Sequence, residues 1–289
     1  MRKHSLWQQL CTPLVLGTFL LLSPASIVGY EAASKTNRPE EAAQESARSL
    51  KYRPTCEYKV EHLLGWKLYV APDLLEDQEL NQRVFAELER QLKQISEAVP
   101  PEALKKIMQV PIWVEKYEGH HPCMAYHPDP EWLRSHDMNP DKAKCVEIAN
   151  GRNFVKWSKT QPWMVLHELA HAYHDQFLPA GFGNRQLRNR FDEVRREALY
   201  EKVKHVNGHE QEAYALKNVM EFFAENSEAF FGKNDFYPFT RDDLEKYDPK
   251  TCALIAAMWG VSVSNTGERP EEKTVQSEAR KETQSQGNQ

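Results

Sequence analysis

The apolar positions in the first half of the chain predict a small sheet and one long helix. Two short apolar runs, at 58–64 and 66–70, favour strands, and Gly65 between them is typical of a turn. Apolar residues then recur every three or four positions from Leu80 to Ile95, the period of a helix, until Pro100 and Pro101 end it. Residues 110–114 and 145–149 predict two further strands.

The second half is predicted to be mainly helical. After Gly151 the apolar spacing favours helices over 161–178, 185–205 and 210–231, followed by shorter ones near 240 and 250. Strands that come first and helices that come later are typical of the α+β class. We therefore expect a small N-terminal sheet followed by a mainly helical half.

The two ends of the chain differ from this folded unit. Residues 30–52 are polar, include the adjacent Glu40 and Glu41 and contain few aromatic side chains, which predicts a disordered linker. Residues 263–289 predict a disordered tail for the same reason. The interval between them, 53–262, has a suitable length for one domain.

The first 29 residues are typical of a secretory signal peptide. Arg2 and Lys3 supply positive charge, residues 14–22 are largely apolar, and small residues follow, with cleavage expected after Ala25 or Gly29. The alternative is an uncleaved anchor, but the apolar run is shorter than the roughly 20 residues of a spanning helix. We expect a secreted or periplasmic protein without stable membrane insertion after signal removal.

Net charge and cysteine content indicate which partners and which disulfides to expect. The net charge is −5, the pI is near 6.1, and no stretch concentrates Lys and Arg among aromatic residues, so nucleic acid is not expected as a partner. Loss of the signal peptide leaves four cysteines in an exported chain, which favours disulfides. We predict the pairs Cys123 with Cys145 and Cys56 with Cys252.

The chemical signal is an H-E-x-x-H motif inside an apolar helix. His167 and His171 are four residues apart, so both rings lie on one helical face and can bind a single Zn²⁺. Glu168 lies beside them, where its carboxylate is placed to act as the general base. The motif predicts a zinc-dependent hydrolase with His167 and His171 as ligands.

A catalytic zinc site usually has a third protein ligand, and the sequence offers several. The metzincin pattern requires Gly at 174 and His at 177, but the chain has His174 and Phe177, so that class is excluded. Glu193 and Glu197 are candidates on the following helix, although this helix is rich in charge and typical of a solvated face.

Glu221 is another candidate for the third ligand. Glu221 and Glu225 are one helical turn apart among aromatic residues, as expected of a metal ligand and a carboxylate that supports the ligands from behind. The competing interpretation is an amphipathic helix whose acidic side faces water.

These two segments together resemble a known family. The sequence from His167 to His171, followed about fifty residues later by the E-F-F-A-E segment starting at Glu221, is similar to the gluzincin catalytic domain of anthrax toxin lethal factor and its bacterial relatives. The resemblance implies a zincin-like fold, Glu221 as the third zinc ligand, Glu225 behind it, and a catalytic tyrosine at Tyr214. Because Tyr214 precedes Glu221 by seven residues, the two share a face if the helix is continuous.

A second stretch, 228–239, resembles exported bacterial proteins of unassigned substrate. The chain lacks the receptor-binding and substrate-recruiting domains of lethal factor and is far shorter, so toxin activity is not carried over.

Five other histidines have less support as ligands. We expect His174 to form a hydrogen bond or lie at the surface, and the loop pair His120 and His121 to be exposed. His205 and His209 flank a predicted turn and are the next candidates for the third ligand if Glu221 does not bind the metal.

The sequence as a whole predicts a zinc metallopeptidase with Glu168 and Tyr214 as catalytic residues and a polypeptide substrate. The peptide is expected to pair with the edge of the strand at 145–149. The alternatives are a catalytically inactive zinc-containing binding protein of the cell envelope and a non-peptide amidase.

Overall fold

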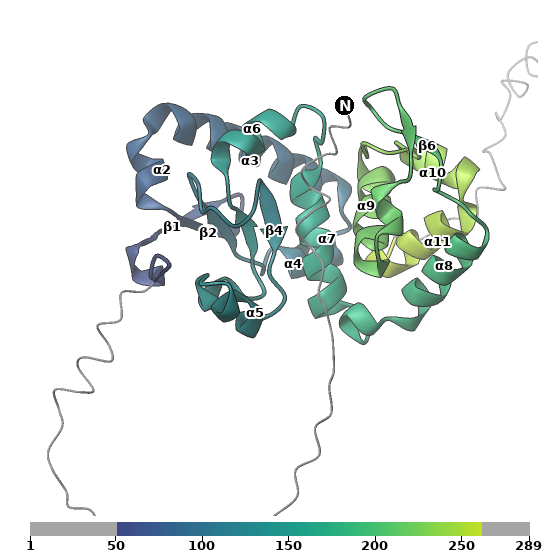
Figure 1. The fold of residues 1–289 in the computed structure, drawn as a ribbon, viewed down its shortest axis with the longest axis horizontal. Coiled ribbons are helices and arrows are strands. Elements are labelled where there is room, and N and C mark those ends of the chain that lie inside the picture. Colours follow the sequence, from purple (N-terminus) through teal and green to yellow (C-terminus); the bar gives the residue numbers. More distant parts are fainter. Residues whose placement is uncertain (1–50, 262–289) are drawn as a thin grey trace, which may run out of the picture.

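A computed structural model of the chain describes residues 51–261. The predicted signal peptide, nearly all of the predicted linker and the predicted tail lie outside the described residues. Figure 1 shows a sheet-containing half and a helical half, with helix α7 (Met164–Phe177) between them. Helix α7 packs against strand β4 (Met124–Tyr126) on one side and helix α9 (Val219–Phe231) on the other. The H-E-x-x-H motif therefore lies where the two halves meet.

The first half contains a mixed five-stranded sheet, which confirms the predicted α+β class. The strand order is β1-β2-β3-β5-β4, and β2, β3 and β5 run parallel to one another, whereas β1 and β4 are antiparallel to their neighbours. The bounds of the other strands are β1 Lys59–Leu63, β2 Trp66–Val70, β3 Ile112–Val114 and β5 Val146–Ile148. These four strands were predicted, and β4 was not.

The predicted role of the 145–149 segment as an edge strand is wrong. Strand β5 is paired on both sides, with β3 and with β4, so its backbone groups are already used. The edge on the side of α7 is β4, a three-residue strand too short to give a clear alternating pattern.

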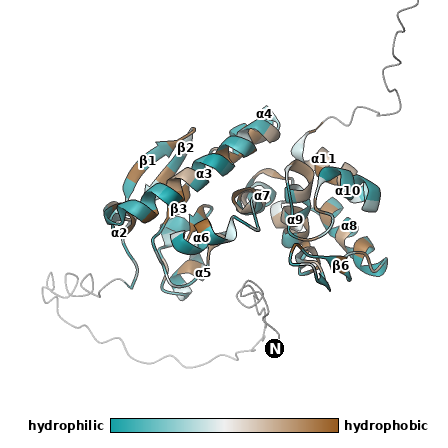
Figure 2. Cartoon of the chain, turned by 90° about the horizontal axis from the view of Figure 1, so that it is seen from above, coloured by the Kyte–Doolittle hydropathy of each residue, from teal (hydrophilic) through white to brown (hydrophobic). Residues whose placement is uncertain are grey.

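The helices of the first half cover the sheet and support α7. The predicted long helix is α3, and its residues Leu80, Val84 and Leu88 are buried while the face seen in Figure 2 is largely hydrophilic. The bounds are α2 Pro72–Glu76, α3 Gln78–Ala98, α4 Pro101–Ile107, α5 Pro130–Ser135 and α6 Gly151–Trp157. Both α3 and α4 contact α7, so the helix that bears the H-E-x-x-H motif is held from this side as well.

The second half is mainly helical, as predicted, but two of its predicted helices are too long. The bounds are α8 Arg185–Arg196, β6 Val203–Lys204, β7 Glu210–Gln211, a 3-10 turn at Tyr214–Leu216, α9 Val219–Phe231, α10 Arg241–Tyr247 and α11 Pro249–Trp259. Ala198 and Tyr200 have positive φ angles of 53° and 69°, which end the predicted 185–205 helix. The Tyr200 hydroxyl is buried and donates to Asp248 at 3.0 Å, so a tertiary contact holds this turn.

The predicted disulfides are also wrong, since Cys56, Cys123, Cys145 and Cys252 are all free in the described chain. Cys123 and Cys145 lie at opposite ends of the β4–β5 ladder, where the Cys123 carbonyl accepts from Ala149 and the Cys145 carbonyl accepts from His127. Four residues of strand separate these positions by about 13 Å, well beyond the roughly 7 Å between Cα atoms that a disulfide can bridge. Cys56 belongs to the sheet half and Cys252 to α11, on the far side of the molecule in Figure 1.

Within residues 51–261, none of the helices combines the length and the apolar character needed to cross a bilayer.

Candidate metal centre

Helix α7 carries His167, Glu168 and His171, and a side chain from the other half of the fold fixes its first turn. Trp163, the N-cap residue, makes no side-chain cap. Instead, the buried Gln91 of α3 accepts a hydrogen bond from the Val165 N–H at 3.0 Å. One of the donors that every helix leaves unpaired at its start is thereby satisfied from α3.

The end of α9 packs closely against the start of α7. Gly232 follows the last residue of α9, and a Cβ atom added there would lie 1.9 Å from the indole ring of Trp163. Because no side chain fits in that space, only glycine allows the end of α9 to contact the start of α7 this closely.

Helix α9 brings Glu221 to the two histidines. Asn218 caps this helix, and its side-chain oxygen accepts from the N–H groups of Met220 and Glu221 at 2.8 and 2.9 Å. The cap places Glu221 in the first turn, where the helix dipole favours a carboxylate.

His167, His171 and Glu221 form one buried group. The Oε2 atom of Glu221 lies 3.1 Å from Nε2 of His167 and 3.2 Å from Nε2 of His171. The helices bearing them pack directly on each other, although 54 residues separate His167 from Glu221. Of the candidates weighed for the third ligand, the structure brings Glu221 to the motif.

The donor set fits a zinc ion. Two imidazole nitrogens and one carboxylate oxygen are a frequent ligand set of catalytic zinc, and tetrahedral ligands at 2.0–2.1 Å from the metal lie about 3.3–3.4 Å apart. The observed separations of 3.1 and 3.2 Å are close to that value. Burial opposes a charge on His167, but its hydrogen bonds to Glu221 and Glu228 outweigh burial and hold its pKa well above the usual value. A divalent cation would take the place of that proton.

The other ring nitrogen of His167 contacts a carboxylate that we did not predict. Nδ1 lies 2.7 Å from Oε1 of Glu228 and 3.6 Å from Oε1 of Glu225. Since a carboxylate only accepts, Nδ1 is the donor, and Nε2 is the nitrogen turned to Glu221. Glu225, the predicted supporting residue, is therefore nearby, but Glu228 makes the closer contact.

The spacing of the acidic residues along α9 could have indicated Glu228 as the third acid on one helical face. Glu221, Glu225 and Glu228 are spaced by four and three residues, which places them along one side of α9. Burial is the main cause that raises the pKa of both Glu225 and Glu228, and for Glu225 repulsion from Asp235 and Glu228 follows.

Glu168 is buried with one carboxylate oxygen bonded and the other without a partner. Oε2 accepts from the backbone N–H of Tyr126 in β4 at 2.8 Å. Oε1 is buried and has no hydrogen-bond partner in the described structure. A buried acceptor without a partner, next to His167 in the chain, is suited to accept a proton from a water molecule.

Tyr214 lies near this group, but not for the reason expected. It belongs to a 3-10 turn, and α9 begins only at Val219, so Tyr214 and Glu221 do not share a continuous helix. Lys217 joins them instead: its ammonium group donates to the Tyr214 hydroxyl at 2.7 Å and lies 4.0 Å from Glu221. The sequence had not singled out Lys217.

The competing ligand candidates lie elsewhere. Glu193 and Glu197 pair with Arg190 and Lys250, which join α8 to α11. His209 is exposed, and neither it nor His205 belongs to the His167, His171 and Glu221 group.

The expectations for His174 and for His121 are wrong. His174 is fully buried between Phe182 and Phe223, neither of its ring nitrogens has a hydrogen-bond partner among residues 51–261, and burial lowers its pKa to about 4. His120 is exposed as expected, whereas His121 is buried against His127.

No family model matches the chain, and neither the curated proteins nor the solved structures include a match to it.

Proposed function

We propose that this protein is a zinc-dependent peptidase of the gluzincin type. The observation that carries the proposal is the buried group of His167, His171 and Glu221, with the unpartnered Oε1 of Glu168 one residue away along the same helix. A structural zinc site normally has four protein ligands and needs no base, whereas a catalytic site keeps three ligands and a position for water. The described group has three.

The residues have separate roles in this proposal. His167, His171 and Glu221 would hold zinc, which when bound acts as a Lewis acid and lowers the pKa of water. Glu168 accepts the proton of the attacking water and returns it to the leaving amine. Tyr214 donates to the oxyanion that develops on the carbonyl, and Lys217 keeps its phenol in position.

Strand β4 is the part of the site suited to a peptide. Cys123 and His127, which flank this strand, exchange backbone hydrogen bonds with the β5 side. Backbone groups alternate along a strand, so those of Met124 and Tyr126 point to the free edge, where Tyr126 already meets Glu168. An extended peptide pairing with this edge would have its backbone next to the base.

The test is peptide cleavage by the full chain with zinc, measured by mass spectrometry on a peptide library. Glu168→Gln should lose at least about 100-fold in kcat/KM, the scale of a lost general base, and should keep one zinc per chain. Glu221→Ala should lose the zinc itself, and Glu193→Gln serves as the control that changes neither.

Two results would contradict the proposal. Cleavage by Glu168→Gln at the wild-type rate would exclude the proposed base. Zinc bound at one per chain with no hydrolysis of any peptide would favour an inactive binding protein or an amidase acting on other substrates.

A further inference from the structure

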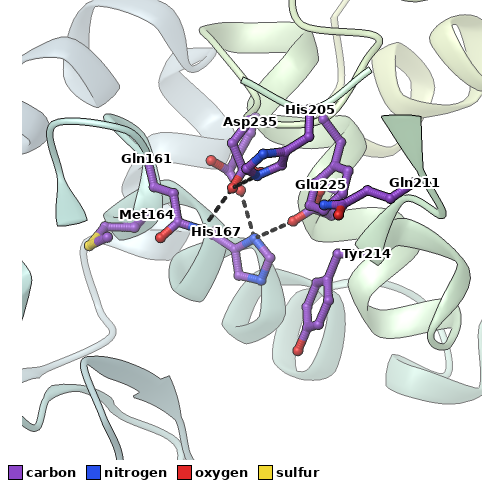
Figure 3. Close-up of a pocket in the computed structure, with 10 residues that line it drawn as sticks. Gln161, Met164, His167, His205, Gln211, Tyr214, Glu225 and Asp235 are labelled. Carbon is purple, nitrogen blue, oxygen red and sulfur yellow. Dashed lines mark hydrogen bonds and ion pairs between the residues drawn. The ribbon is translucent and has the colours of Figure 1, made fainter. Parts of the chain in front are cut away.

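A small cavity of about 40 Å³ lies beside His167, on the side away from β4. Its inner wall carries the carboxylates of Glu225, Glu228 and Asp235, all more than nine-tenths buried. Gln161, His205 and Gln211 also line it and are partly exposed, so they form its opening. Figure 3 shows Glu225 directed toward the His167 ring, and Asp235 beside Gln161 and His205.

The three carboxyl groups of this cavity have few hydrogen-bond donors among the residues that line it. Glu228 is bonded to His167, and Asp235 accepts from Gln161 at 2.9 Å and contacts His205 at 3.4 Å. Oε2 of Glu225 is buried and has no partner in the described structure. Among the described residues that line the cavity there is no Lys or Arg. A buried carboxylate oxygen without a donor is costly, and a cationic group would relieve that cost.

We infer that this cavity binds the side chain of a lysine next to the peptide bond that is cleaved. The inference rests on the proposed peptidase function and names its substrate class. His167 forms one wall, and its opposite nitrogen belongs to the metal group, so a side chain in the cavity is attached close to the reacting carbonyl.

The dimensions and lining favour lysine over other cations. A cavity needs about 10–15 Å³ to hold one water molecule. The 40 Å³ of this cavity therefore holds roughly three or four heavy atoms, which corresponds to the outer part of a lysine side chain. Met164 and Phe236 supply apolar surface for the methylene groups, and the compact ammonium reaches the carboxylates. A bare metal ion would leave that apolar surface without a contact, and the planar guanidinium of arginine is larger.

The experiment compares peptides that differ only in lysine or norleucine at each position next to the cleaved bond. Hydrogen bonds to charged groups predict a preference for lysine of roughly 10- to 100-fold in kcat/KM with the zinc-loaded wild type. Asp235→Asn should reduce that ratio several-fold, while Glu193→Gln, a remote acid, should not change it.

A binding measurement provides a readout that does not depend on turnover. Zinc-loaded Glu168→Gln should bind the lysine peptide more tightly than the norleucine peptide by calorimetry, and the added Asp235→Asn change should remove the difference. The wild-type ratio needs no variant, so it remains decisive if Asp235→Asn does not fold.

Three outcomes would overturn the inference. Zinc-dependent cleavage with a lysine to norleucine ratio near one would reject the lysine pocket and leave the peptidase proposal intact. A second metal ion per chain that Asp235→Asn removes would assign the cavity to a metal. Absence of cleavage of any peptide would reject the peptidase proposal and this inference together.

Discussion

The contact between Glu228 and His167 makes a quantitative prediction about zinc affinity. Glu228→Gln keeps the shape of the side chain and an acceptor oxygen, but it replaces a charge-assisted hydrogen bond of 2.7 Å with a neutral one of about half the strength. Changes to such supporting partners typically cost 10- to 100-fold in metal affinity, or about 1.4–2.8 kcal/mol. We expect the single variant at the lower end, because Glu225 lies 3.6 Å from the same nitrogen and can take over part of the contact.

The double variant Glu225→Gln with Glu228→Gln removes that substitute and should approach a 100-fold loss. The assay is equilibrium competition for zinc against a chromophoric chelator at pH 7, with folding of each variant checked by circular dichroism. Glu193→Gln, whose carboxylate pairs with Arg190 and Lys250, is the matched control and should bind zinc like the wild type. The reasoning would be refuted by a folded double variant whose zinc affinity is within twofold of the wild type.

Three further predictions concern stability. Gln91→Leu removes the acceptor of the Val165 N–H and should lower the free energy of unfolding by about 1–3 kcal/mol in urea titrations; no change would mean that α7 does not depend on this contact. Lys142→Met removes the ammonium group that the buried Glu115 and Glu147 share, and because Glu115 keeps its pair with Arg53 the cost should lie near the lower end of the usual range, about 3 kcal/mol in the same assay; a neutral result would contradict it. His174 has its pKa lowered by burial to about 4, so the unfolded chain binds the proton first and stability should fall as the pH drops from about 6.5 to 4, by on the order of 3 kcal/mol. His174→Leu should remove that part of the pH dependence, and an unchanged unfolding profile against pH would count against it.

Local patterns in the sequence were sufficient for the regular elements and for the motif itself. Strand β2 and the long helix α3 follow from apolar periodicity, which depends only on the geometry of a single element. The pairing of His167 with His171 on one face has the same origin, because spacing along one helix needs no tertiary contact. The aromatic residues around Glu221 favoured it among several candidates, and the resemblance to the gluzincin domain implied it as the third ligand.

Tertiary contacts decided the features that the periodicity could not show. Short segments such as β4 carry too few residues for a period, and the turn at Tyr200 depends on a hydrogen bond to Asp248, 48 residues later. The predicted cysteine pairs were wrong because an even number of cysteines says nothing about the distances between them. The register of β4 and β5 holds Cys123 and Cys145 at opposite ends of their ladder.

The sequence by itself determined that two histidines share a face of one apolar helix, with a glutamate next to the first of them, and that a helix carrying acidic residues follows about fifty residues later. The packing of α7 between β4 and α9 decided which carboxylate meets the histidines, which one lies behind His167, and where Glu168 finds a backbone donor. The physical reason is that a metal group needs donor atoms within a few ångströms in three dimensions, and side chains on different elements reach that distance only when the core between them is packed.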